Sequence, residues 1–240
     1  MCGIIGCIGK ENCLDILLNG LLQLQNRGYD SAGTCLISEN NFVIKKFASS
    51  ENESALEKLN KNKNILSSKI GIGHTRWATH GKKNDINSHP HLSYDNKISL
   101  VHNGIIENFD TLKKFLISKN IEFKSETDTE VIANLLAYNI NISDESDTFM
   151  KSLKKTLSQL EGTWGLAILY NKEPNKIYCV RHGSPLLVSV TESFALISSE
   201  VSGFNNLVNN YFVLNNNDIC EIVLENDKIV CSTNNNYELK

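Results

Sequence analysis

The order of the predicted elements favours an α+β fold made of layered sheets with helices packed outside. Short apolar runs bounded by glycine or turn residues predominate early in the chain, amphipathic helical patterns fill its middle, and strand patterns return after Gly162. Strands that are followed by helices and then by strands again are typical of sheets whose outer faces are covered by helices.

The first hundred residues predict five strands, two helices and one long loop. The strands cover residues 2–8, 34–38, 42–47, 70–76 and 98–102. The strands at 34–38 and 42–47 are predicted to form a hairpin. Leucines at helical spacing from Leu14 to Leu22 predict one helix, which stops at Arg27-Gly28, and residues 53–60 predict a short polar helix. The loop at 79–96 holds three histidines and a proline, and loops of this length are often functional.

Three helices and six further strands are predicted in the rest of the chain. Asn108 is expected to cap the first helix, which would direct four apolar residues inward: Phe109, Leu112, Phe115 and Leu116. Thr127 to Glu130 reads as a T-x-x-E capping box for the second helix, which would bury Val131, Ile132, Leu135 and Leu136. The third helix is predicted at 148–160. The strands are predicted at 164–170, 176–181, 186–190, 194–198, 218–224 and 228–231.

Composition excludes several classes of protein. The chain has 240 residues, 41% of them hydrophobic, and a formal net charge of -3, which suits one large domain or two small ones. This balance gives no basic surface for nucleic acid or an anionic membrane. No apolar run approaches the roughly eighteen residues of a membrane span, and the start lacks the layout of a signal peptide, so a cytoplasmic location is expected.

The seven cysteines are an odd number with no C-x-x-C pair, which indicates neither a disulfide framework nor a zinc site. Most are expected to be buried free thiols, Cys7 among them. Cys2 differs, because removal of Met1 would make it the N-terminal residue. Its α-amine could then take the proton of its own thiol, so that one residue supplies both nucleophile and base. Second-position cysteines also occur without function, so Cys2 alone does not establish an enzyme.

Four polar clusters sit where predicted strands end or helices begin: residues 27–33, 74–81, 102–108 and 125–130. Each has a purely structural alternative. Asn103-Gly104 is a common hairpin turn, Asp128 would complement a helix dipole, and Arg76 and Trp77 could form a surface stack.

His89-Pro90-His91 could suggest a metal site, but no carboxylate or thiolate accompanies the two histidines at ligand spacing. A metal is therefore not expected here.

Taken together and in order behind Cys2, the clusters resemble the glutaminase domains of class II glutamine amidotransferases, which are N-terminal-nucleophile hydrolases. Within that class, the segments R-G-Y-D-S-A-G, W-A-T-H-G, H-P-H and V-H-N-G-I-I-E-N are most similar to enzymes that make glucosamine 6-phosphate from fructose 6-phosphate. The resemblance covers residues 2–235. It implies an αββα sandwich, with two mostly antiparallel sheets between helical layers.

The resemblance also implies roles for individual residues. Cys2 would be the nucleophile, and Asn103 and Gly104 would stabilise the oxyanion. Arg76 would bind the α-carboxylate of glutamine, for which a planar guanidinium is well suited, and Asp128 would bind its ammonium group. The pocket would be lined or covered by Trp77, Thr79, His80 and Gly81. Supporting roles would fall to Arg27, His89 and His102.

The function implied is hydrolysis of L-glutamine to glutamate and ammonia through a thioester on Cys2, with no cofactor and no metal. Residues 1–235 would form this domain, and 236–240 would be a frayed tail or the start of a linker. The ammonia would serve amino sugar synthesis by a sugar-isomerase domain, in cis or in trans, that this sequence does not contain. A different acceptor, or a module that binds glutamine without cleaving it, remains an alternative. The sequence leaves the oligomeric state open, a homodimer included.

Overall fold

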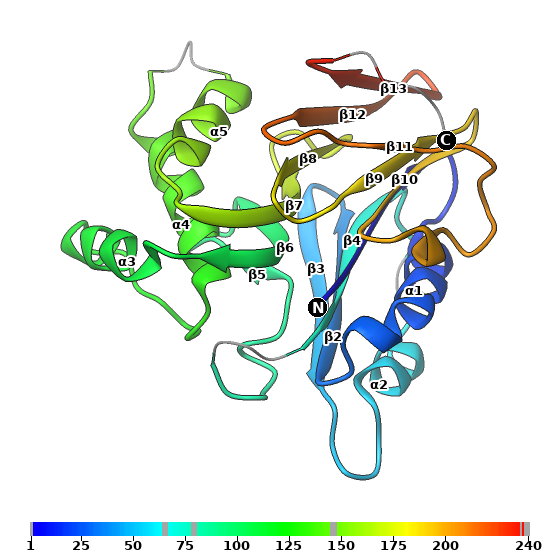
Figure 1. Cartoon of the computed structure of the whole chain (residues 1–240), viewed down its shortest axis with the longest axis horizontal. Helices are drawn as coiled ribbons and strands as arrows, with labels where there is room; N and C mark the ends of the chain where they lie inside the picture. The colour runs from blue at the N-terminus through cyan, green and yellow to red at the C-terminus, as the bar shows by residue number, and fades with distance from the viewer. Residues whose placement is uncertain (1, 64–66, 78–80, 145–147, 236, 238–240) are drawn as a thin grey trace.

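The computed structural model has two antiparallel sheets that pack face to face between two groups of helices (Figure 1). It describes residues 2–63, 67–77, 81–144, 148–235 and 237. The predicted αββα sandwich is confirmed.

The larger sheet has the strand order β11-β9-β10-β1-β4-β2-β3. Its strands are β1 (Gly3–Gly9), β2 (Ser31–Ser38), β3 (Asn41–Ala48), β4 (Ile70–Arg76), β9 (Leu187–Val190), β10 (Phe194–Ser198) and β11 (Phe212–Val213). The smaller sheet has the order β13-β12-β8-β7-β6-β5. Its strands are β5 (His91–Leu92), β6 (Ile98–Ile106), β7 (Gly162–Tyr170), β8 (Lys176–His182), β12 (Ile219–Glu225) and β13 (Lys228–Thr233).

The helices fall into two groups on opposite outer faces of the sandwich (Figure 1). The larger sheet is covered by α1 (Leu14–Gln23) and α2 (Ala55–Lys61), with the short 3-10 helices η1 (Gln25–Arg27) and η2 (Val201–Phe204) beside them. The smaller sheet is covered by α3 (Phe109–Ser118), α4 (Asp128–Asn141) and α5 (Phe149–Leu157). No helix in the described ranges is long and apolar enough to cross a membrane.

Alternation along the strands divides the apolar residues among three cores. In β1, Ile4 and Ile8 face the space between the sheets, whereas Ile5 and Cys7 pack beneath α1. In β6, Val101 faces the other sheet and Leu100 faces the helices. Because successive side chains point to opposite faces of a strand, both sheets are buried on two sides. Cys7 is fully buried, as expected.

Strand β6 continues four residues beyond its predicted end and includes Asn103 and Gly104. The hairpin turn proposed for this pair is wrong, because Asn103 pairs with Gly165 and Gly104 with Trp164 of β7. Two short strands, β5 and β11, were not predicted.

Helices α3 and α4 differ from the predictions in three respects. The Asn108 side chain does not cap α3: its amide donates to the carbonyl of Gln159 and its oxygen accepts from the N–H of Glu161. Phe115 is 37% exposed rather than buried. Thr127 does cap α4 through the N–H of Glu130, but the Glu130 carboxylate does not return to Thr127. That carboxylate accepts from the N–H groups of Lys124 and Ser125 instead.

Candidate active site

Three strands direct polar side chains into one end of the space between the sheets. Continuing the inward-facing series of β1 back from Ile4 leads to Cys2, and continuing that of β4 from Ile72 leads to His74 and Arg76. Strands β1 and β4 are neighbours, with Ile4 opposite His74. Asn103 follows Val101 on the inward face of β6. The apolar core therefore gives way to polar groups at the same end of both sheets.

Cys2 and Arg76 border a pocket to which Gly104, α4 and the loop before β5 also contribute, whereas His74 and Asn103 lie outside its lining. Its lining comprises Cys2, Arg76, Trp77, His89, His102, Gly104, Thr127, Asp128 and Thr129. The structure thus brings together seven of the residues singled out in the sequence. Gly81 lies outside this lining, beside Asn87 and Glu126. Thr79, His80 and the side chain of Arg27 fall outside the described parts of the structure.

The Cys2 thiol lies against the backbone of Trp77. The N–H of Trp77 donates to the sulfur at 3.3 Å, and the sulfur lies 3.6 Å from the carbonyl oxygen of the same residue. The Trp77 ring meets the ring of Tyr29 edge-on, with 5.3 Å between the centroids, and Trp77 is 44% exposed.

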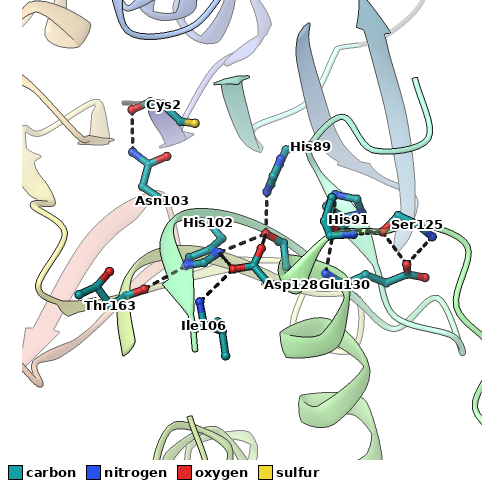
Figure 2. Close-up of polar contacts among 12 residues, drawn as sticks. Cys2, His89, His91, His102, Asn103, Ile106, Ser125, Asp128, Glu130 and Thr163 are labelled. Atoms are coloured by element: carbon teal, nitrogen blue, oxygen red, sulfur yellow. Dashed lines mark hydrogen bonds and ion pairs between the residues drawn. The ribbon is translucent and has the colours of Figure 1, made fainter. Parts of the chain in front are cut away.

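Asn103 and Gly104 lie next to the backbone of Cys2. The Asn103 Nδ2 donates to the carbonyl oxygen of Cys2 at 2.8 Å (Figure 2). Gly104 has a φ of +137°, and an added Cβ would overlap the carbonyl oxygen of Thr163. Only glycine fits this backbone. The side-chain amide of Asn103 and the main-chain amide of Gly104 are thus consecutive donors beside Cys2.

Arg76 is only 4% exposed, and the chain is shaped around it. A Cβ on Gly28 would lie 2.6 Å from the Arg76 carbonyl carbon, so glycine permits the close approach of the two backbones. Burial lowers the pKa of Arg76, while the charges of Cys2, Asp30 and Asp128 act in the opposite direction. A guanidinium remains charged under these conditions, and a buried one is a strong site for a carboxylate.

Asp128 is the first residue of α4 and is also buried. Its Oδ2 accepts the N–H of Ile106 at 2.9 Å and lies 3.9 Å from Nδ1 of His102 (Figure 2). Asp128 therefore complements the helix dipole, as the structural alternative states, and also lines the pocket. The pocket has a buried cation and a buried anion in its wall, which is the charge pattern that a free amino acid requires.

Two threonines that line the pocket contact three buried histidines, of which His89 and His102 also line it. Thr129 Oγ1 contacts Nε2 of His89 at 2.9 Å and Nδ1 of His102 at 3.1 Å, and Thr127 Oγ1 contacts Nε2 of His91 at 3.1 Å (Figure 2). Burial lowers the pKa of each of these histidines. No group of three or more His, Cys, Asp or Glu in the part of the chain described is arranged to hold a metal ion.

Sequence reasoning missed His74, Thr127 and Thr129 as parts of the site. Thr129 lines the pocket and joins two of its histidines. His74 is fully buried and bonds to Asn103 across the space between the sheets. The period of two along β4, which places His74 on the same face as Arg76, could have identified it.

Curated relatives match nearly the whole chain. The glutamine–fructose-6-phosphate aminotransferase (isomerizing) of Clostridium perfringens is 41% identical over 231 residues, or 95% of this chain and 36% of the relative. The enzyme of the same name from Caldanaerobacter subterraneus is 43% identical over 222 residues, 92% of this chain and 35% of the relative. The chain thus spans little more than a third of these proteins.

Solved structures share the fold. Glutamine phosphoribosylpyrophosphate amidotransferase from B. subtilis superposes with a TM-score of 0.76 at 23% identity, over 96% of this chain and 48% of its own. A structure described as the allosteric regulatory enzyme of purine biosynthesis gives a TM-score of 0.79, with the same identity and coverage.

The family model of the glutamine amidotransferase domain matches residues 74–206, which run from β4 through η2 and include Arg76 and Asp128 of the pocket and Asn103. Since this model spans more than half of the sequence, the chain belongs to the glutamine amidotransferase domain family.

Proposed function

We propose that this chain hydrolyses the side-chain amide of L-glutamine to glutamate and ammonia. The observation that carries the proposal is one pocket lined by Cys2, Gly104 and the opposite charges of Arg76 and Asp128, with the Asn103 amide bonded to the Cys2 carbonyl. A carboxamide hydrolase for a free amino acid needs these three kinds of group together.

In the proposed reaction Cys2 is the N-terminal residue after loss of Met1. Its α-amine takes the thiol proton, and the sulfur attacks the amide carbon of glutamine to form a tetrahedral intermediate. The Asn103 amide carries two protons, one of which binds the Cys2 carbonyl, and the other is assigned to the oxyanion together with the N–H of Gly104. The amine returns its proton to the leaving nitrogen, ammonia departs and a thioester remains. Water, deprotonated by the same amine, then attacks the thioester carbon; the C–S bond breaks, glutamate leaves, and the amine returns the proton to the sulfur of Cys2.

Arg76 is proposed to bind the α-carboxylate and Asp128 the ammonium group of the substrate. Trp77, Thr79, His80 and Gly81 are proposed to line or cover the bound glutamine, and Arg27 to organise the N-terminus. His89 and His102 are proposed to support the pocket wall through Thr129.

The destination of the ammonia is proposed from the relatives. Their names describe amination of fructose 6-phosphate, and this chain spans 36% of the first of them. We therefore assign the acceptor reaction, which gives glucosamine 6-phosphate, to a sugar-isomerase domain in cis or in trans. A reducing, cytoplasmic setting agrees with cysteines that are free and mostly buried.

The test compares wild-type protein, verified by intact mass to begin at an unmodified Cys2, with Cys2→Ala. Wild type should release glutamate and ammonia in equal amounts, with or without fructose 6-phosphate, and Cys2→Ala should release none while keeping its fold. Cys7→Ala is the matched control, because Cys7 is buried in the core beneath α1 and should leave turnover largely intact. Glutamine binding without turnover in wild type would instead indicate a binding module.

A further inference from the structure

The buried ring of His74 bridges the two sheets. Its Nε2 lies 3.0 Å from Oδ1 of Asn103 and 3.1 Å from the carbonyl oxygen of His102, both on β6 of the smaller sheet. His74 itself is on β4 of the larger sheet, opposite Ile4 of the strand that follows Cys2. The contact therefore links the strand next to the thiol with the strand that carries the amide pair.

The chemistry of these contacts fixes the proton on His74. A backbone carbonyl only accepts hydrogen bonds, so the nitrogen that faces the His102 carbonyl must carry the proton. The same N–H then faces the Asn103 side chain, which must present its oxygen rather than its amino group. As a result Nδ2 of Asn103 is directed away from His74 and toward Cys2.

The ring has little freedom to leave this position. It is fully buried and stacks on the ring of His89, with 4.1 Å between centroids and 25° between planes. Burial lowers the pKa of His74 to about 3, although the bonds to Asn103 and His102 act in the opposite direction. The imidazole is therefore neutral at neutral pH, with Nε2 as its donor.

We propose that His74 is a positioning residue that holds the Asn103 carboxamide with Nδ2 toward the reacting centre, an inference that rests on the proposed role of Asn103 in glutamine hydrolysis. Without the His74 donor only the bond to the Cys2 carbonyl holds the amide, and a rotated amide would place Oδ1 where the oxyanion forms. An oxygen there would repel the developing negative charge, so the effect belongs to the transition state.

The kinetic test uses His74→Leu, His74→Gln, Asn103→Ala and the double variant His74→Leu/Asn103→Ala. His74→Leu should lower kcat about 10-fold to 100-fold with little change in KM. His74→Gln keeps an amide donor and should recover most of the loss. The double variant should be no slower than Asn103→Ala alone, because the His74 effect acts through that side chain. Losses that multiply in the double variant, or a Gln variant as slow as Leu, would overturn the proposal.

A spectroscopic test does not depend on turnover. In protein labelled with 15N at histidine, His74 should be the neutral Nε2–H tautomer from pH 5 to pH 8, and the Nδ1–H tautomer would overturn the proposal. Leu116→Ala controls for lost stability, since the Leu116 side chain of α3 is buried in the core between that helix and the smaller sheet, and its loss should leave kcat unchanged in the folded protein. If wild type released no ammonia, the proposed function would fail while the tautomer result still decided the position of Asn103.

Discussion

At the scale of single residues, the candidate oxyanion site depends on a backbone conformation that only one amino acid adopts. Gly104 has a φ of +137° within a paired strand, and its missing side chain leaves room for the carbonyl oxygen of Thr163 on β7. Its neighbour Asn103 has both ends of its amide engaged, with Cys2 on one side and His74 on the other. Gly104 thus supplies a backbone conformation that other residues cannot adopt, and Asn103 supplies a side-chain amide of fixed orientation.

We expect Gly104→Ala to be strongly impaired. The added methyl group overlaps the Thr163 carbonyl and strains the backbone, so β6 must move and its N–H must leave the proposed oxyanion position. Turnover of glutamine should fall by about 100-fold or more, with a loss of roughly 1–3 kcal/mol in the free energy of unfolding. Gly165→Ala is the matched control, because its Cβ would meet Leu186 and Ser184 at 3.3 Å, a tight contact that a shift of a few tenths of an ångström relieves, and its loss should be much smaller. Equal effects of the two substitutions would contradict the assignment.

At the scale of elements, sequence patterns located most strands but misplaced the structure around the site. Strand β4 has its predicted bounds of residues 70–76. Isoleucines that face inward alternate there with glycines that face outward, which gives a clear period of two. The turn proposed at Asn103-Gly104 is wrong, because nine residues of β6 pair with β7 and outweigh a local preference. Strands β5 and β11 have two residues each, too few for any period. The bond between His74 and Asn103 depends on how two sheets stack, which no local pattern encodes.

Lys46 of strand β3 contacts the loop before β5 through three hydrogen bonds. The ammonium group of Lys46 donates to three backbone carbonyls, those of Ile86 at 3.1 Å, Ser88 at 2.7 Å and Pro90 at 3.2 Å. Burial lowers the pKa of Lys46 to about 8, so the group is mostly charged at pH 7. The residues that it holds flank His89, which lines the pocket.

We expect Lys46→Met to lower the free energy of unfolding at pH 7 by about 1–3 kcal/mol, because the three carbonyls lose their donor while the apolar stem is retained. Urea denaturation measures this change. Lys45→Met, at the adjacent position on the other face of β3, should alter the free energy by less than about 0.5 kcal/mol. If both variants were equally stable, the lysine would not be holding the loop.

At the scale of the whole molecule, the fold encloses four uncharged histidines where its two sheets meet α4. His74, His89, His91 and His102 are each less than 9% exposed, and burial lowers the pKa of each. The rings of His74 and His89 stack, and His89 meets His91 edge-on. A cluster of this kind is stable only while its members are neutral, which ties folding of the sandwich to pH.

We therefore expect the protein to lose stability between pH 7 and pH 5. In the unfolded chain each histidine takes up a proton near pH 6.5. In the folded protein burial holds the pKa of His74, His89 and His91 well below that value and lowers that of His102, so the unfolded state binds more protons as the pH falls. Each histidine that stays neutral should lower the free energy of unfolding by about 2 kcal/mol at pH 5. Carboxylates contribute little in this range, because they titrate near pH 4 when unfolded.

Urea denaturation at pH 8, 7, 6 and 5 should show the free energy of unfolding declining in wild type and declining less steeply in His91→Gln. The measurement at pH 8 is the baseline, because histidine is neutral there in both states. Equal slopes in the two proteins would mean that His91 is protonated in the folded structure.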